Sequence, residues 1–592
     1  MPRSASVLAL ALALTAGCGL EQLWRTDSTG ADGPAPAKPA DCLAAVVPGQ
    51  PFELPAELVA PTYPEAPAPA EPPLLRLDLA AGRVQAYTVQ TAHEGPSPFA
   101  PGKDGYTVRE RVELRGAGQH LGRYLVYGEP PPGFPDADKG ERLQGLVVDV
   151  GDDTTIRGRV SQELELQMRL PLPPAPLLPG AAIARPVRFP IDSFFTHLFA
   201  RGTMTFMLDR YVTVDGHRGI QYRVKLDIHD VDRIPELTKP PTVALTVHAV
   251  VVFDLDDRSF VAVRSHATAK VDLFPGDSPR GEFGGSFGAT AEVSRTSLDR
   301  DPARSAPGAA PEPAVPAARC GLAVQAGVAF TVPPELAAAV TYPEAPAPAK
   351  PPHIRWDFAA GKVHAYAATL VEPTPNTFIA GSRETTTTTL ATWVFHGQAN
   401  GLARYVGHER IEDPGEPDPK LDDMLGFVIV DVGPDSSIDG RISQEAELRL
   451  RFPVPPAPLV AGQPIAAPFE FPFNIQGAMF YGRGTTTYQL DRYVQVDGHL
   501  AVQYSVKTEV RDVDAPPEVT ARPDINLDHH AVAVFDLEAG EFVAVHSREH
   551  QRIDLTRTIP GAPPGGAAGE TTIRTTTLRD PSRITDPLPR PR

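Results

Sequence analysis

Cysteine is scarce in this chain of 592 residues, which contains three, at Cys18, Cys42 and Cys320. They lie far apart in the sequence, so no cluster could supply the closely spaced thiolates of a zinc or iron–sulfur site. Positive charge is also in short supply, because 55 Lys and Arg stand against 73 Asp and Glu, a formal net charge of −18. Since binding to phosphates needs a basic surface, this balance argues against a nucleic-acid partner.

Long hydrophobic runs are missing after the first twenty residues. No later stretch reaches the roughly eighteen apolar residues that a membrane-spanning helix needs. Proline and glycine are plentiful instead, with 67 and 49 residues, and 42% of the chain is hydrophobic. Because proline and glycine disfavour helices and the hydrophobic content suffices for packed cores, we expect folded domains with little helix. No motif indicates a cofactor, and we expect none.

The N-terminus has the layout of an export signal. Arg3 precedes the apolar run Ala5–Ala16, and small residues lead from there to Cys18. An apolar run of this length is too short to span a bilayer. The pattern resembles a bacterial lipoprotein signal peptide, residues 1–17, followed by its lipobox cysteine.

The resemblance implies cleavage before Cys18, attachment of lipid to the Cys18 sulfur and acylation of the new amino group. Several acyl chains on one residue would hold the chain firmly to a membrane. In such signals Gly19, rather than Asp, favours the outer membrane, so we expect a cell-envelope protein whose remaining residues lie outside the cytoplasm. The alternative is an ordinary secretory signal in which Cys18 has no role.

The chain repeats itself. The nine residues Thr62–Ala70 recur without change at Thr341–Ala349. Two longer segments recur at a constant offset of 282, with 18 of 28 and 13 of 18 residues identical: Asp149–Pro176 with Asp431–Pro458, and Leu208–Lys225 with Leu490–Lys507. The chain therefore contains two copies of one unit, and a period of this size indicates domains rather than a solenoid.

The repeats divide the chain into domains. Two Pro- and Ala-rich segments, 18–41 and 299–319, have the composition of semi-extended spacers. We predict a signal peptide at 1–17, a tether at 18–41, a first β domain at 42–298, a linker at 299–319, a second β domain at 320–581 and a tail at 582–592.

Within each unit the hydrophobic period is two. Apolar and charged residues alternate along Tyr222–Ile228 as in a strand with one buried face, and Leu164–Leu170 predicts another strand in the same way. Further strands are predicted at Leu74–Leu79, Val84–Gln90, Val108–Leu114, Tyr124–Tyr127, Leu146–Val150, Val243–Leu255 and Phe260–Leu273. No amphipathic helix longer than about two turns stands out. These patterns predict an all-β fold with two tandem homologous antiparallel domains, each a curved sheet or half-barrel, or a sandwich.

Both copies contain the three residue types of a hydrolase triad: Ser161, Asp209 and His217, with Ser443, Asp491 and His499. A hydrolase exposes its nucleophile on a strained turn such as Gly-x-Ser-x-Gly, whereas Ser161 lies in Arg-Val-Ser-Gln-Glu. Glu163 and Glu165 share a strand face with Arg169, which favours a solvated surface over a pair of glycosidase carboxylates. We therefore predict that the chain is not an enzyme.

Histidine and aspartate also recur at equivalent positions that a metal could use: His248 with His530, and Asp230 and Asp232 with Asp512 and Asp514. Calcium needs about six to eight oxygens in a compact loop, and no Asp-x-Asp-x-Asp-Gly pattern is present, although oxygen-rich turns such as Asp149–Asp153 occur. Hairpin turns and strand ends account for these residues, so we predict no metal site.

One position departs from the alternation. In Met204–Val214 the even-numbered residues are apolar except Arg210, and Arg492 repeats this in the second copy. A three-residue hairpin loop would pair Arg210 with Tyr222 on the buried face. The alternative is a two-residue Asp-Gly turn with a bulge, which turns Tyr211 inward and releases the arginine to solvent.

The three-residue loop leads to a ligand hypothesis. A guanidinium beside a tyrosine inside a curved sheet must be paired or accessible, because unpaired burial of charge is prohibitive. Under this register Arg210 and Tyr222, with their twins Arg492 and Tyr504, would line a groove for an acyl or anionic ligand. An internal ion pair with Asp or Glu is the alternative.

Cys42 and Cys320 stand at corresponding places near the starts of the two copies. In an oxidising compartment two leftover cysteines pair where geometry allows. A Cys42–Cys320 bond would require the two domains to pair with each other about a pseudo-two-fold axis. The alternative is two free thiols in flexible segments.

Three segments resemble poorly characterised bacterial envelope lipoproteins: the opening strand Ile354–Tyr366, Leu490–Tyr493 after a Pro-rich stretch, and the hairpin Phe535–Phe542. Some of those proteins are thought to share the curved half-barrel of periplasmic lipoprotein carriers, and the resemblance brings no catalytic residues. We expect a non-enzymatic, lipid-anchored binding or scaffold module whose partners are the membrane and an envelope protein or hydrophobic ligand. The alternative is a carrier or sensor that holds an acyl or other hydrophobic ligand in the concave face of each unit.

Overall fold

The fold is described from a computed structural model of the chain. Cys18, Cys42 and Cys320 lie outside the residues that the structure describes, as does the predicted signal peptide. Among the described residues, no helix combines the length and the apolar character that a membrane span requires. The described residues are 46–58, 61–96, 104–118, 120–128, 142–156, 160–193, 196–231, 242–272, 284–300, 324–339, 341–372, 387–412, 425–438, 442–475, 478–514, 524–554 and 568–580.

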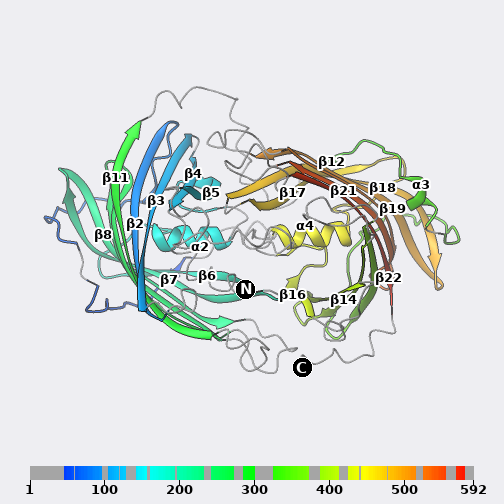
Figure 1. Cartoon of the computed structure of the whole chain (residues 1–592), viewed down its shortest axis with the longest axis horizontal. Coiled ribbons are helices and arrows are strands. Elements are labelled where there is room, and N and C mark those ends of the chain that lie inside the picture. The colour runs from blue at the N-terminus through cyan, green and yellow to red at the C-terminus, as the bar shows by residue number, and fades with distance from the viewer. Residues whose placement is uncertain are drawn as a thin grey trace.

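In this part of the chain each copy forms one curved antiparallel sheet of eleven strands (Figure 1). The first sheet contains β1 (Val47–Pro48), β2 (Arg83–Pro96), β3 (Asp104–Gly118), β4 (Leu121–Gly128), β5 (Arg142–Gly151), β6 (Ala182–Ser193), β7 (Thr196–Val214), β8 (His217–Val231), β9 (Thr242–Asp254), β10 (Ser259–Asp272) and β11 (Gly284–Arg300). The second contains β12 (Gln325–Ala326), β13 (Val363–Glu372), β14 (Thr387–Gly397), β15 (Ala403–Glu412), β16 (Leu425–Val432), β17 (Ile465–Ile475), β18 (Ala478–Val496), β19 (His499–Asp514), β20 (Asp524–Asp536), β21 (Glu541–Asp554) and β22 (Ala568–Arg579). The prediction of two tandem, antiparallel, all-β units is confirmed.

The order of the strands determines where the helix of each copy lies. Neighbours in the first sheet run β1-β6-β7-β8-β9-β10-β11-β2-β3-β4-β5, and the second sheet repeats this order. Strands β5 and β6 are consecutive in the chain but lie at opposite edges, so their connection has to cross a face of the sheet. It does so through helix α2 (Val160–Arg169), and α4 (Ile442–Arg451) makes the same crossing in the second copy. Both helices lie in the hollow of their sheet (Figure 1).

The strand predicted over Leu164–Leu170 is therefore wrong, because these residues belong almost entirely to α2. Leu, Glu, Gln, Met and Arg are all good helix formers. A helix enclosed by a curved sheet also needs no narrow apolar stripe, so the helical period is hidden. The predicted strand Leu74–Leu79 is an extended segment outside the sheet, and its alternate residues Leu75, Leu77 and Leu79 are buried in the core. A one-turn helix, α3 (Pro334–Ala337), lies between β12 and β13 in the second copy.

Each helix shares one core with the inner face of its sheet. In the first copy this core contains Leu166 of α2 together with Phe206 and Tyr222 of the sheet, all at most 1% exposed. The Tyr222 hydroxyl donates to the carbonyl oxygen of Pro171, just after α2, at 2.5 Å. Tyr504 donates to Pro453 at 2.9 Å in the second copy. The same contact therefore ties helix to sheet in both units.

The outer face of each sheet is covered by the segment that precedes the first long strand. We call these segments the straps: the described residues of 46–73 in the first copy and of 324–352 in the second. Tyr63 packs on an outer cluster of Val212, Val214 and Val252. Its twin Tyr342 packs on the equivalent outer cluster of the second sheet. The straps therefore bury apolar surface that the helices cannot reach.

Equivalent pairs of strands join the two sheets. Strand β7 pairs in parallel with β16, and β5 pairs in parallel with β18, the equivalent combination. Arg188 and Arg201 of the first copy lie 3.8 and 3.5 Å from the Asp431 carboxylate of the second. Val406 of β15 is fully buried in the core of the first copy. The reciprocal pairing is what a pseudo-two-fold relation between the copies produces.

Truncation of Leu166 tests the position of α2. Leu166→Ala should lower the free energy of unfolding by about 2–5 kcal/mol, because a fully buried leucine leaves a cavity. Leu178→Ala, at a residue 51% exposed in the same unit, should change it by less than about 0.5 kcal/mol. Urea unfolding of the two variants makes the comparison, and equal effects would contradict a helix buried in the sheet.

Candidate functional site

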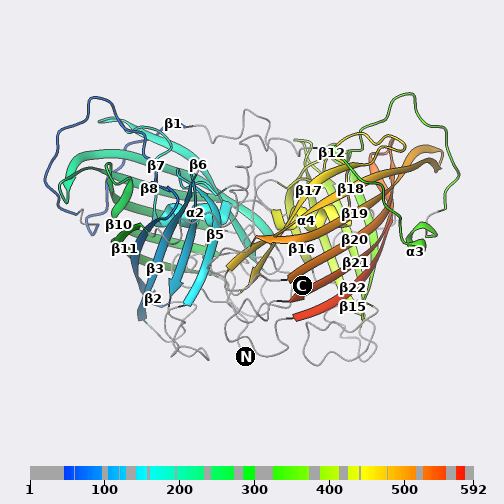
Figure 2. The ribbon, with the colours of Figure 1, turned by 90° about the horizontal axis from the view of Figure 1, so that it is seen from above.

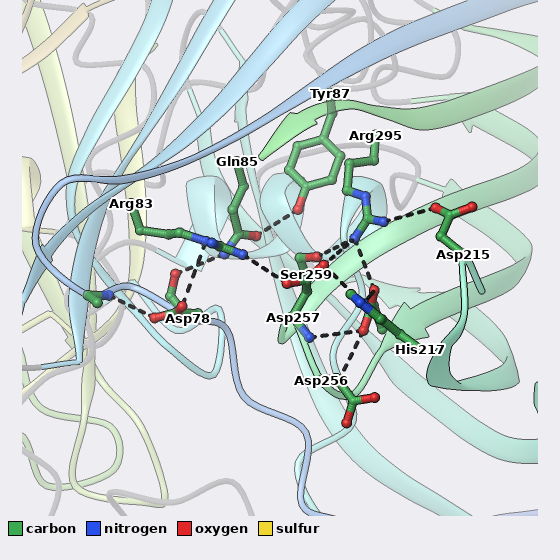
Figure 3. A network of polar contacts seen from close by, with 12 residues as sticks. Asp78, Arg83, Gln85, Tyr87, Asp215, His217, Asp256, Asp257, Ser259 and Arg295 are labelled. Atoms are coloured by element: carbon green, nitrogen blue, oxygen red, sulfur yellow. Dashed lines mark hydrogen bonds and ion pairs between the residues drawn. The ribbon is translucent and has the colours of Figure 1, made fainter. Parts of the chain in front are cut away.

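One end of the first sheet carries a network of charged and polar side chains (Figure 3). Its members come from β2 and the segment before it, from the β7–β8 and β9–β10 turns, and from β10 and β11. We call it the end cluster: Asp78, Arg83, Gln85, Tyr87, Asp215, His217, Asp254, Asp256, Asp257, Ser259 and Arg295. The topology brings these residues together although more than two hundred positions separate the first from the last.

Arg295 lies at the centre of the end cluster. Its guanidinium donates to Ser259 Oγ at 2.8 Å and to Asp254 Oδ2 at 3.3 Å, and reaches the Asp215 carboxylate at 3.5 Å. The Asp254 side chain is fully buried. Its second oxygen, Oδ1, accepts the backbone N–H groups of Asp256 and Asp257 at 3.0 and 2.9 Å. One carboxylate thus fixes the β9–β10 turn and neutralises the arginine at the same time.

The second copy builds the same cluster with partly different residues. His499 Nδ1 lies 3.0 Å from Asp536 Oδ2, as His217 lies 3.2 Å from Asp254. A further contact to the backbone is made by different side chains in the two copies. Gln85 donates to the carbonyl oxygen of Asp78, and in the second copy His364 Nε2 lies 2.9 Å from the carbonyl oxygen of Asp357. The equivalent residues are Asp357, Lys362, His364, Tyr366, Asp497, His499, Asp536, Glu538, Glu541 and Arg579.

Two substitutions between the copies compensate each other. Ala539 takes the place of Asp257, which removes a carboxylate, and Glu541 takes the place of Ser259, which restores one. Glu541 accepts a hydrogen bond from Arg579 at 2.8 Å. The balance of charge around the arginine is therefore kept while the positions of its partners change.

Three end-cluster residues have a spacing that a metal ion could use. His217, Asp254 and Asp257 each present one ligand atom, and these atoms lie within 4.8 Å of one another. The Arg295 guanidinium, however, lies 3.3 Å from Asp254 Oδ2 and 3.8 Å from Asp257 Oδ2, where it supplies the positive charge itself. Because the second copy has Ala539 in place of Asp257, we assign no metal to this group.

The residues considered for a hydrolase triad do not form one in the described contacts. Asp209 accepts hydrogen bonds from Gln221 and Arg223 at 2.5 Å each, whereas His217 contacts Asp254 and Asp257. Ser161 belongs to α2 rather than to a strand. In the second copy Asp491 accepts from Ser505, and His499 again contacts the end-cluster aspartate.

The three-residue hairpin loop predicted beside Arg210 is wrong, and the two-residue turn with a bulge is right, although Arg210 stays half-buried. Asp215 and Gly216 both have positive φ, 51° and 87°, which is the backbone of a two-residue hairpin turn. The register shifts between Leu208 and Arg210, so the arginine pairs with Gln221 rather than Tyr222. Tyr211 consequently turns into the inner core.

The bulge separates the four residues of the ligand hypothesis into two pairs. Tyr222 and Tyr504 are buried in the inner cores, whereas Arg210 and Arg492 follow the bulge and lie in phase with the outer faces. Arg492 Nε donates to Gln503 Oε1 at 3.1 Å. The structure therefore does not bring arginine and tyrosine together in one groove. The pairing of Cys42 with Cys320 lies outside the described residues and stays a prediction.

A second polar group lies inside the hollow, at the end of α2. Arg169 Nη1 donates to the Tyr124 hydroxyl at 2.9 Å, and Nη2 lies 2.9 Å from Glu110 and 3.5 Å from Glu165. We call these four residues the groove cluster. The pKa of Glu165 is raised to about 7, mainly by burial and also by the neighbouring Glu110 charge, against the attraction of Arg169. The solvated surface predicted for Glu165 and Arg169 is therefore wrong.

The second copy also holds the last arginine of its helix inside the hollow. The Arg451 guanidinium lies 4.7 Å from the ring centre of Trp393, which stands where the first copy has Val112. Burial raises the pKa of Glu549, and the charge of Arg451 opposes that shift. Ala267 is the first-copy equivalent of Glu549, so this acidic residue on β21 occurs in the second copy alone.

Comparison with known proteins places the chain in no family. No family model matches the sequence, and no curated protein matches it. The outer membrane channel DcaP of Acinetobacter baumannii has 6% identity and a TM-score of 0.11, over 85% of this chain and 100% of that one. OccK11 (OpdR) of Pseudomonas aeruginosa has 8% identity and a TM-score of 0.09, over 86% and 100%. TM-scores this low carry no argument, so the class that the structure defines is a tandem pair of helix-filled, curved antiparallel sheets.

His217 and His499 should titrate above the usual value. A hydrogen bond to Asp254 raises the pKa of His217 above 6.5, and Asp536 does the same for His499. Since the folded-state pKa is raised, this contribution to stability is complete below the unfolded-state pKa and is lost as the pH rises through the folded-state value. Asp254→Asn should lower the His217 pKa in an NMR titration and leave that of His499 unchanged, whereas a parallel drop in both would contradict separate clusters.

Removal of Arg169 should lower the free energy of unfolding, because its acidic partners are buried. Arg169→Met leaves the Glu110 carboxylate buried without its cation and should destabilise the protein by about 3–5 kcal/mol. Replacing both members, Arg169→Met with Glu110→Leu, should recover much of that loss. As a control, Arg218→Met breaks an exposed pair with Asp256 and should cost about 0–1 kcal/mol in the same urea titration. Equal losses for Arg169→Met and Arg218→Met would contradict a buried groove cluster.

Proposed function

We propose that the chain is a non-enzymatic, lipid-anchored envelope protein that acts as a binding or scaffold module. The observation that carries this proposal is the filling of both hollows by a helix of the same chain. Leu166 and Leu448 are buried between helix and sheet, at 0 and 1% exposure. A module of this kind would meet its partners through outer faces, straps and loops.

The polar groups favour binding over catalysis. In both copies the end cluster joins turns to neighbouring strands and keeps its charge balance through compensating substitutions. Ser259 accepts a hydrogen bond from Arg295, and its equivalent in the second copy is Glu541. The Ser259 hydroxyl is therefore not a nucleophile that both copies share. General acid–base or nucleophilic chemistry would need a base within reach of such a group.

The alternative is a carrier or sensor of an acyl or other hydrophobic ligand. The curved shape of the sheets favours it, because a concave apolar face is where such a ligand would lie. The helices occupy that face, so a ligand would have to take the place of α2 or α4. Lipid attachment at Cys18 is part of the proposal in either case.

Mass spectrometry of the protein purified from envelopes tests these statements together. The N-terminal peptide should begin at Cys18 and carry the mass of its acyl chains, and Cys18→Ser should abolish both that mass and membrane retention. An organic-solvent extract of the soluble part of this variant should contain no stoichiometric acyl compound. An unmodified Cys18 would overturn the anchor, and one bound acyl ligand per unit would replace the scaffold by the carrier.

A further inference from the structure

We propose that the two straps are docking sites for a protein that recognises polyproline II helices through an aromatic-lined groove. This inference deepens the proposed binding function by giving it a surface and a class of partner. It rests on that function but not on the lipid anchor.

The last twelve residues of each strap are nearly identical in the two copies. Thr62–Pro73 and Thr341–Pro352 are identical at eleven of twelve positions, and differ where Glu71 stands against Lys350. The helical segment, which builds the core, is identical at 18 of 28 positions over Asp149–Pro176. This part of the strap is therefore more similar between the copies than that core segment is.

The sequence of the strap fixes its conformation. Proline locks φ near −65°, and it also pushes the residue before it into the extended region. Pro64, Pro67 and Pro69 and their preceding residues make up six of the nine positions of Thr62–Ala70. A polyproline II helix has about three residues per turn, so every third residue should face the sheet.

Burial along the straps has this period. Tyr63, Ala66 and Pro69 are half-buried against the sheet, as are their twins Tyr342, Ala345 and Pro348. The six residues between them are exposed in both copies: Thr62, Pro64, Glu65, Pro67, Ala68 and Ala70 in the first. Packing therefore accounts for a third of the identical residues. Exposed positions usually tolerate substitution, so the identity of the outward-facing residues needs another cause.

The backbone of the strap is held in place before any partner binds. Ala66 donates to the Tyr211 carbonyl at 3.0 Å, and Thr213 donates to that of Pro64 at 2.8 Å. The second copy repeats both bonds, from Ala345 to Tyr493 at 2.9 Å and from Gln495 to Pro343 at 2.8 Å. A segment already ordered in its bound conformation loses little entropy when it binds.

The exposed side of the strap has the features of a polyproline ligand. Pro64 and Pro67 are three residues apart, so they lie on the same side of the helix and form a Pro-x-x-Pro ridge. Such ridges dock in grooves lined by aromatic side chains. Glu65, exposed beside the ridge in both copies as Glu344, adds a negative charge for a basic residue at the rim of the groove.

The two straps lie at opposite ends of the molecule (Figure 2), one in the blue and one in the green part of the chain. They therefore act as separate sites, and one chain should take two copies of the partner. A partner with two grooves would gain affinity by engaging both straps only if its own grooves span that separation.

Photo-crosslinking in intact envelopes identifies the partner. A crosslinking amino acid is placed in the full-length protein at Ala68, at Ala347 and, as a control, at the exposed Arg218 of β8. The same protein should be captured from both strap positions and not from Arg218. A synthetic peptide with the sequence of Thr62–Ala70, added in excess to opened envelopes, should prevent its capture. Absence of a shared adduct, or an adduct that the peptide leaves unchanged, would overturn the proposal.

Calorimetry with that purified partner then measures the site. Pro64→Ala with Pro67→Ala should halve the number of bound partners, and adding Pro343→Ala with Pro346→Ala should weaken binding by more than about tenfold. Glu71→Ala with Lys350→Ala, at the position where Thr62–Pro73 and Thr341–Pro352 differ, should leave binding unchanged. Circular dichroism checks that each variant is folded, and Glu65→Lys with Glu344→Lys serves as a second test if the proline variants unfold. Wild-type binding by folded strap variants would overturn the proposal.

The outcome is separable from that of the lipid anchor. The Cys18→Ser protein should leave the membrane yet bind the partner with the same affinity and stoichiometry. Loss of strap binding with membrane retention intact would overturn the docking site alone, whereas an unmodified Cys18 with strap binding intact would overturn the anchor alone.

Discussion

A curved sheet of eleven strands has an apolar inner face that must be covered, and in both copies the chain covers it with its own helix. The strand order places the covering helix in the connection between two strands of the same sheet. Because β5 and β6 lie at opposite edges, the segment between them has to pass over the hollow, and its residues are helix formers. The hydroxyl of Tyr222, and of Tyr504 in the second copy, ties the end of that segment to the sheet. The straps on the outer face are then the exposed elements best placed for binding.

The charged clusters follow a different rule from the cores. Between the two copies, apolar core residues are replaced by apolar residues of other sizes, whereas charged residues are lost and gained in pairs. Loss of Asp257 accompanies the gain of Glu541, and the second copy has Ala391 in place of Glu110 and Glu549 in place of Ala267. A buried charge without a partner is costly, so the loss of one partner requires another charged residue at a neighbouring position. This constraint explains why both clusters persist although several of their residues differ between the copies.

Half-buried strands could be predicted from the sequence, because one wet face leaves a period of two, as in Tyr222–Ile228. The helix α2 could not, since burial on most sides removes the helical stripe. The end cluster also could not be predicted from patterns within one segment, because the strand order alone brings Asp254 and Arg295 together. A signal was present in the compensating differences between the copies. The choice between two hairpin registers at Arg210 depended on the backbone of Asp215 and Gly216, for which the Asp-Gly sequence was compatible with both.

Native-state hydrogen exchange of the α2 amides tests the central claim most directly. If the helix is part of the core, the amides of its last two turns should exchange as slowly as those of β7 and β8, through global unfolding. Equal protection is therefore the predicted result. Fast exchange of α2 beside a protected sheet would show a helix that leaves the hollow readily, and would contradict the account of a filled interior.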